Sequence, residues 1–217
     1  MPHKKYKKRE KINIALIQSE IAALVPIYCQ DGGNGTGVMT TNGRCLSDKR
    51  SLRWFLRRLC RHLAVDLEAL REKYGACIDR RNFVPIPLSP QLVLVPLHLR
   101  QPRIKGDRAS GYVNLIAVKK VEEIKQRESE HGQRQVKSAL HLHGEHTVYC
   151  YYTTKTVNER LRMARIVLHY YEQSRGNWEN YVNSYSLQYP KLAEEGFNRE
   201  QIVFLTQQLL QTLLQKR

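Results

Sequence analysis

Hydrophobic positions follow a strand-like pattern in the middle of the chain. Valine, leucine and tyrosine fill two runs, Leu92–Leu99 and Tyr112–Leu115, and turn-forming residues bound each run. Prolines interrupt the surrounding sequence at Pro85, Pro87, Pro90, Pro96 and Pro102. Because a proline removes one hydrogen-bond donor from a ladder, it restricts how such strands pair. The pattern predicts an edge strand, a protruding loop over residues 100–108, and a more central strand beginning at Gly111.

Shorter strand patterns occur on both sides of this region. Ile12–Ile17 and Leu24–Cys29 have the composition of two short strands, or of one strand and its connection. Strong turn signals follow them at Asp31–Gly35 and Asn42–Gly43. They predict a small β-meander at the N-terminal side. The alternation in Ala139–Tyr152 predicts a hairpin around its central glycine. Between these regions, the three-residue apolar spacing of Val118–Ile124 predicts a short helix or turn.

Helical spacing replaces strand spacing in three segments. Apolar residues recur at three- and four-residue steps over Ser47–Tyr74, which predicts one amphipathic helix that Gly75 terminates. Thr153–Arg175 repeats the pattern, with Gly176 as its terminator. Leucines in Phe197–Arg217 predict a last helix that either packs on its own domain or forms a homo-oligomer.

Together these elements predict an α+β fold. It has a mixed or antiparallel β core, flanking basic amphipathic helices and a C-terminal helical segment. The expected organisation is a basic disordered arm over residues 1–11, an α+β DNA-binding domain over residues 12–176, and the helical segment over residues 177–217.

Charge narrows the class of partner. The chain has 36 Lys and Arg against 20 Asp and Glu, a net charge of +16, and a pI near 9.8. Such a basic protein favours a polyanion, most commonly nucleic acid, with an anionic membrane surface as the other candidate. No apolar run approaches the roughly 20 residues that span a bilayer, and the N-terminus lacks the apolar core of a signal peptide. Five scattered cysteines without metal-binding spacing indicate reduced thiols, so we expect a cytoplasmic protein without a membrane partner.

Basic residues gather in two of the predicted elements. The exposed face of the N-terminal half of the Ser47–Tyr74 helix carries six cations and no acid: Lys49, Arg50, Arg53, Arg57, Arg58 and Arg61. Cations near a helix start oppose the macrodipole. Phosphate contact would offset this cost, and a plain solvated face is the alternative. The predicted DNA-binding residues, from this helix and from the central strands and loop, are Arg50, Arg53, Arg57, Arg61, Arg100, Arg103, Lys105, Arg108 and Asn114.

A histidine-rich segment raises a competing hypothesis. The spacing in His141–His146 is similar to zinc-binding histidines in metallo-β-lactamase-like hydrolases, but Glu145 replaces an aspartate of that pattern. No phosphate-binding glycine loop, nucleophile elbow or dinucleotide-binding motif is present. We therefore expect no enzymatic activity, no cofactor and no bound metal. RNA binding is the other alternative, with Tyr149, Tyr151 and Tyr152 as stacking candidates.

Two family resemblances rest on the central region. Its order of strand, Pro-Leu-Ser-Pro, strand, basic loop and Gly-Tyr-Val-Asn-Leu resembles the competence transcription factor ComK over roughly Ile12–Ile166. The segment RASGYVNL, with the later Leu-rich hairpin, also resembles a LytTR-type DNA-binding domain. The basic helix at 49–74 stands where ComK relatives have a Gly-Ser-Ser-Tyr-x-Gly-Arg segment. These likenesses imply a sequence-directed transcription regulator that binds double-stranded DNA. The ComK likeness adds A·T-rich targets, minor-groove reading and DNA bending.

Overall fold

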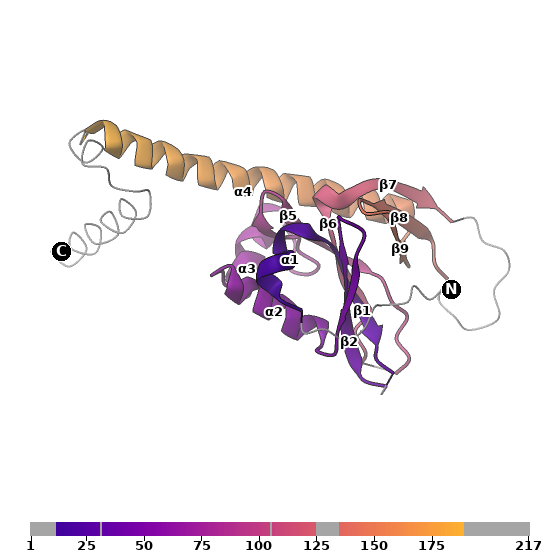
Figure 1. The fold of residues 1–217 in the computed structure, drawn as a ribbon. Coiled ribbons are helices and arrows are strands. Elements are labelled where there is room, and N and C mark those ends of the chain that lie inside the picture. The colour runs from indigo at the N-terminus through magenta and orange to yellow at the C-terminus, as the bar shows by residue number, and fades with distance from the viewer. Residues whose placement is uncertain (1–11, 31, 105, 125–134, 189–217) are drawn as a thin grey trace. The chain divides into compact units, whose positions relative to one another are not determined.

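The chain has an α+β architecture whose strands are all antiparallel, which confirms the predicted fold class (Figure 1). The computed structural model describes residues 12–30, 32–104, 106–124 and 135–188. The strands are β1 Ile21–Tyr28, β2 Asn34–Thr40, β3 Cys45–Asp48, β4 Ile86–Ser89, β5 Leu92–His98, β6 Ser110–Asn114, β7 Val118–Glu123, β8 Ser138–Leu142 and β9 His146–Cys150. The helices are α1 Ile14–Ile17, α2 Leu52–His62, α3 Leu67–Cys77 and α4 Thr154–Gln188, with 3-10 helices η1 Gln18–Glu20 and η2 Leu115–Ala117.

Six strands form the larger sheet, in the order β3-β2-β1-β6-β5-β4, and β7-β8-β9 form a second sheet. The predicted meander is present as β1, β2 and β3, and the predicted hairpin as β8 and β9. The strand beginning near Gly111 is central, since β6 lies between β1 and β5. The edge position predicted for β5 is wrong, because β4 pairs outside it and carries Pro87 at the actual edge.

Alternating side chains of the six-stranded sheet supply two separate cores. On one face, residues such as Leu24 and Leu94 pack against α1, α2 and the start of α3. On the other face, residues such as Val95 and Val113 pack against β8, β9 and the first turns of α4. Figure 1 shows the corresponding layers, with α1, α2 and α3 on one side of the sheet. Successive side chains of a strand point to opposite faces, so neighbours such as Leu94 and Val95 enter different cores.

The predicted Ser47–Tyr74 helix is two helices. Ser51 caps α2, with its Oγ accepting a hydrogen bond from the Trp54 N–H at 3.4 Å. The helix ends near Ala64, which adopts a left-handed φ of 54°, and Asp66 caps α3 through the Ala69 N–H. Aspartate is a favourable N-cap residue, so a second helix begins directly after the break. The apolar spacing continues across the break, which is why the sequence predicted one helix.

Gly75 does not end a helix but lies inside α3. A Cβ at this position would lie 2.5 Å from the Arg80 carbonyl oxygen and 3.2 Å from Val84 Cγ2. The glycine therefore allows the chain that follows α3 to pack directly against the helix. The prediction that Gly75 terminates the helix is wrong, because the position requires glycine for this close approach.

Three further segments differ from the sequence predictions. Ile12–Ile17 contains helix α1, where Asn13 Oδ1 accepts the Ala15 N–H, in place of a strand. Val118–Glu123 is strand β7 and not a short helix. Helix α4 continues through Gly176 to Gln188, so the prediction that Gly176 terminates this helix is wrong.

The chain divides into two compact units, Met1–Tyr171 and Glu172–Arg217. The boundary predicted from sequence lies after residue 176. The predicted arm at residues 1–11 and the last predicted helix, Phe197–Arg217, lie outside the described residues.

Candidate nucleic-acid interface

Several strand ends meet at one end of the six-stranded sheet. Tyr28 pairs with Asn34, and His98 pairs with Ser110, so the β1–β2 turn and the β5–β6 loop follow directly from paired strand ends. Because β1 and β6 are antiparallel neighbours, these two connections lie at the same end. The β3–α2 connection joins them there, since Asp48 pairs with Thr36 near the start of β2. We call residues 28–34, 48–51 and 99–109 the basic end.

Helix α2 leads away from the basic end with a row of arginines on its outer side. Leu52, Phe55, Leu56, Leu59 and Cys60 are buried. The helical repeat therefore places Arg53, Arg57 and Arg61 on the opposite, exposed face, about one turn apart. Residues 49–65 contain no aspartate or glutamate. Within the described residues, these three arginines have no carboxylate partner.

Arg50 occupies a different environment from that row. Its Nε and Nη2 donate to the two carboxylate oxygens of Asp48 at 2.8 and 2.6 Å, and its guanidinium lies 3.6 Å from the Trp54 ring centroid. Asp48 is 5% exposed in its side chain. Burial alone would raise the pKa of the Asp48 carboxyl, but the hydrogen bonds and charge of Arg50, with the charge of Arg58, leave this pKa below its ordinary value. Arg50 thus fixes the start of α2, with less of its side chain available to a ligand than predicted.

The β5–β6 loop is fastened to the β1 strand by Tyr28. The guanidinium carbons of Arg100 and Arg103 lie 4.1 and 4.3 Å from the Tyr28 ring centroid. The Tyr28 hydroxyl donates to Asp107 Oδ2 at 2.6 Å and accepts the Arg103 N–H at 2.7 Å. Asn34 Nδ2 donates to Asp107 Oδ1 at 3.0 Å. Hydrogen bonds from Tyr28 and Asn34 hold the pKa of the Asp107 carboxyl below its usual range.

Tyr28 and Asp107 organise the loop, although neither is among the residues predicted for the site. They are 79 positions apart, and no local pattern connects them. Only the pairing of β1 with β6, which the sequence did not predict, brings them together.

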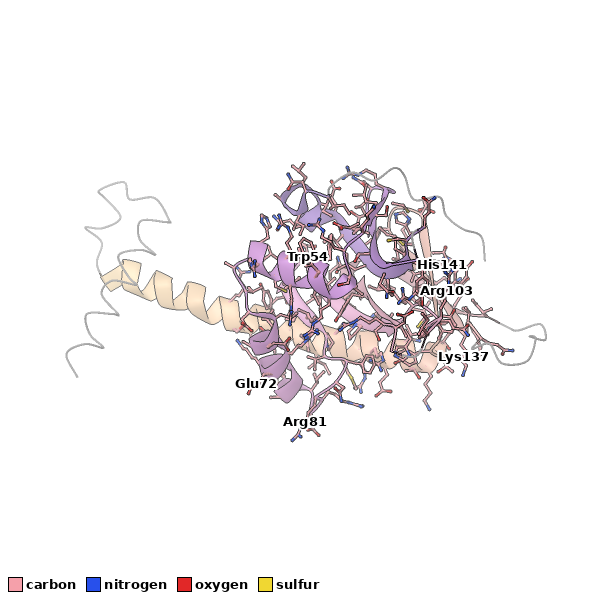
Figure 2. The ribbon with its side chains drawn as sticks, turned by 90° about the horizontal axis from the view of Figure 1, so that it is seen from below. Trp54, Glu72, Arg81, Arg103, Lys137 and His141 are labelled. Atoms are coloured by element: carbon pink, nitrogen blue, oxygen red, sulfur yellow. The ribbon has the colours of Figure 1, made fainter. Side chains whose placement is uncertain are left out.

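The predicted loop cations divide into one inward and two outward residues. Arg100 is half-buried and donates from Nη1 to the Ile27 carbonyl oxygen at 3.2 Å. Its Nε and Nη2 are buried without a hydrogen-bond partner in the described structure, and burial lowers the pKa of its guanidinium. Arg103 and Arg108 are exposed. Figure 2 labels Arg103 in this loop and Trp54 on α2. Lys105 lies outside the described residues.

Asn114 is used inside the fold. It is 3% exposed, and its Oδ1 accepts the Val93 N–H at 3.1 Å and the Ile116 N–H at 3.3 Å. Its Nδ2 donates to the Ile21 and Gln91 carbonyl oxygens at 3.0 and 2.9 Å. The side chain joins β6 to its neighbours and lies too deep to reach a ligand, so we leave it out of the candidate interface.

The histidines of the β8–β9 hairpin diverge. His141 Nε2 lies 2.9 Å from Glu122 Oε2, and His143 is exposed. His146 is 2% exposed and donates from Nε2 to the Thr40 carbonyl oxygen at 3.0 Å. Among the residues described, no three His, Cys, Asp or Glu side chains are grouped closely enough to hold a metal ion. We do not carry the zinc-hydrolase alternative further.

The three tyrosines considered for RNA stacking differ in exposure. Tyr149 is 36% exposed on β9, whereas Tyr151 is half-buried, and burial raises the pKa of its hydroxyl. Tyr152 is stacked on His98 at 4.5 Å between ring centroids. They do not form one open aromatic surface.

Comparisons with known proteins give no family assignment. No family model matches the sequence, and neither a curated protein nor a solved structure matches the chain. Across the described ranges, none of the helices has the length and apolar character needed to cross a membrane.

Proposed function

We propose that this chain binds double-stranded DNA through the basic end and α2, and that it is a sequence-directed transcription regulator. The observation that carries the proposal is that two kinds of cation adjoin the basic end, one on its loop and one along the helix that starts there. Arg53, Arg57 and Arg61 form an acid-free row on α2. Arg103 and Arg108 are exposed on a loop that Tyr28 holds in place.

The two sets suit different parts of a duplex. A row of solvated arginines neutralises phosphates, which positions a protein without reading sequence. A cation on a fixed loop approaches groove walls and base edges, and a narrow A·T-rich minor groove attracts arginine through its enhanced negative potential. The ComK likeness makes A·T-rich DNA the preferred target and competence control the regulated process in this proposal.

Fluorescence anisotropy across salt concentrations tests the proposal. The probes are an A·T-rich duplex, a G·C-rich duplex of equal length, and single-stranded RNA. We expect preference for the A·T-rich duplex that persists at physiological salt. Equal and steeply salt-dependent binding to all three would indicate a generic polyanion binder and contradict sequence-directed recognition. Preference for the RNA would favour the RNA-binding alternative, in which Tyr149 supplies stacking.

A charge-matched control distinguishes the loss of specific contacts on α2 from the loss of net positive charge. The test variant replaces Arg53, Arg57 and Arg61 with glutamine. The control replaces Lys155, Arg162 and Arg165 with glutamine; these are exposed on α4 and belong to the layer on the opposite face of the six-stranded sheet. Because both variants lose three positive charges, a larger effect of the α2 variant would localise binding to α2.

A further inference from the structure

An exposed isoleucine lies in the β5–β6 loop. Ile104 is 71% exposed and directly follows the exposed Arg103. The Asp107 N–H donates to the Ile104 carbonyl oxygen at 3.1 Å, which closes a four-residue turn. Gly106 has φ 99°, a left-handed conformation that glycine adopts readily. A Cβ on Gly106 would meet nothing within 4 Å, so this side of the turn is open.

Hydrogen bonds on both sides of Ile104 fasten the turn. Before it, the Arg103 N–H donates to the Tyr28 hydroxyl at 2.7 Å. After it, Asp107 accepts from Tyr28 at 2.6 Å and from Asn34 at 3.0 Å. The isoleucine is therefore presented on a braced turn, and inserting it into a ligand would require little further ordering of the backbone.

Exposure alone does not distinguish Ile104, because single apolar residues are common on protein surfaces. Leu16 is as exposed as Ile104, at 72%, but it lies on the four-residue α1. Ile104 differs in its position between basic residues of the sequence RIKG and in the bracing of its turn. A polyanion that contacts the exposed Arg103 would therefore lie close to the exposed side chain of Ile104.

We propose that Ile104 inserts between adjacent base pairs of the bound duplex and unstacks one base step. The inference rests on the proposed DNA-binding function and deepens it by naming the residue that deforms the duplex. Branched apolar side chains act as such wedges at kinked steps. Arg103 then lies beside the inserted side chain and contacts the groove wall or an adjacent base edge. The favoured step is pyrimidine–purine, above all TA, because it unstacks most easily. Recognition would thus include a step that the protein distinguishes by deformability.

The test uses the full-length protein and duplexes with 2-aminopurine at a central TA step. Unstacking raises 2-aminopurine fluorescence, so wild type should increase it on binding. Ile104→Ala should remove most of the increase and weaken binding to the TA duplex about 10- to 30-fold, because less apolar surface is buried. Its affinity for a duplex without pyrimidine–purine steps should change by less than about threefold, since such steps resist unstacking.

Leu16→Ala is the matched control, since it truncates an equally exposed apolar residue outside the loop. It should leave both the fluorescence increase and the affinity at wild-type values. Both side chains are mostly exposed, so thermal unfolding midpoints should remain those of wild type and confirm that the variants are folded.

The outcomes separate this inference from the proposed function. If wild type binds duplex DNA but Ile104→Ala retains the full fluorescence increase, the insertion is wrong and DNA binding stands. If wild type binds without any increase, the insertion is likewise wrong. If wild type binds no duplex at physiological salt, both proposals fail together.

Discussion

The arginine row on α2 and the arginines of the β5–β6 loop differ in how firmly they are held. Arg53, Arg57 and Arg61 extend from a helix into solvent. Arg100 and Arg103 instead lie against the Tyr28 ring. Long side chains in water adjust to any nearby phosphate, whereas ordered ones favour one geometry. Net charge alone therefore describes this protein poorly, because its exposed arginines lie in two different environments.

The α2 row and the β5–β6 loop also differ in their acidic residues. Residues 49–65 contain none, so nothing in that stretch competes with a ligand for the α2 row. The loop contains Asp107, but its carboxylate is occupied by Tyr28 and Asn34. The carboxylate of Asp107 thus holds the loop in place within the candidate interface.

The largest effect should come from removing the α2 row. Changing Arg53, Arg57 and Arg61 together to glutamine should weaken binding to every duplex by about 100-fold at physiological salt. The slope of log affinity against log salt should become shallower by about 0.9 for each phosphate that the protein no longer neutralises. Salt titrations by anisotropy measure both quantities. A weakening confined to A·T-rich DNA would contradict the division of tasks, since phosphates are the same in all duplexes.

Arg103→Ala should show the opposite pattern. If Arg103 makes a good base contact, the preferred duplex should lose about 1–3 kcal/mol of binding free energy. Non-specific DNA should lose much less, and the salt slope should change by no more than the value for a single phosphate. Competition between the two duplexes measures the ratio of the two affinities directly. Equal losses of affinity for both would show that Arg103 binds a phosphate like the others.

Tyr28→Phe tests the attachment of the loop, because it keeps the ring and removes the hydroxyl. Two hydrogen bonds are removed, which should cost about 1 kcal/mol of unfolding free energy, because the site is partly exposed. The preference for A·T-rich DNA should fall several-fold, whereas binding to G·C-rich DNA should not change. Chemical denaturation and paired anisotropy titrations check the two parts. Tyr170→Phe, an exposed tyrosine on α4, is the control and should alter neither.

The smallest effect should be the pH dependence that Asp107 contributes. Its folded-state pKa is lowered, so its stabilising contribution is present above the unfolded-state value of about 4. It is lost as pH falls through the folded pKa. Wild type should therefore be more stable than Asp107→Asn at neutral pH, and the gap should close in acid. Denaturation midpoints followed from neutral pH to below the ordinary carboxyl pKa test this, and a gap that widens in acid would contradict it.

Local patterns predicted the fold class and most of the strands. Continuous apolar runs between turn residues identified β5 and β6, and alternation identified β8 and β9. The apolar spacing of α2 placed its buried face correctly. The break between α2 and α3 escaped prediction, because the apolar spacing continues while Ala64 adopts a left-handed conformation. At Gly176 the sequence predicted a helix end that is absent, since α4 continues through this residue.

The candidate site was only partly predictable. The arginines were visible as a charge cluster, and their exposure follows from the helical repeat. The internal uses of Arg50, Arg100 and Asn114 depend on interactions within the folded chain, such as the hydrogen bond between Asn114 and Ile21, 93 residues apart. Polar residues at strand ends carry the same sequence signal whether they face a ligand or complete a hydrogen-bond network.

The outer strands of the six-stranded sheet have a consequence for aggregation. Both β3 and β4 are four residues long, and β4 contains Pro87. Short strands and proline leave few backbone groups to which another chain could add a strand. At the edge of the second sheet, β7 carries Lys119, Lys120, Glu122 and Glu123, and charges discourage strand addition there too. Copies of this chain should therefore not associate by adding strands at β3, β4 or β7.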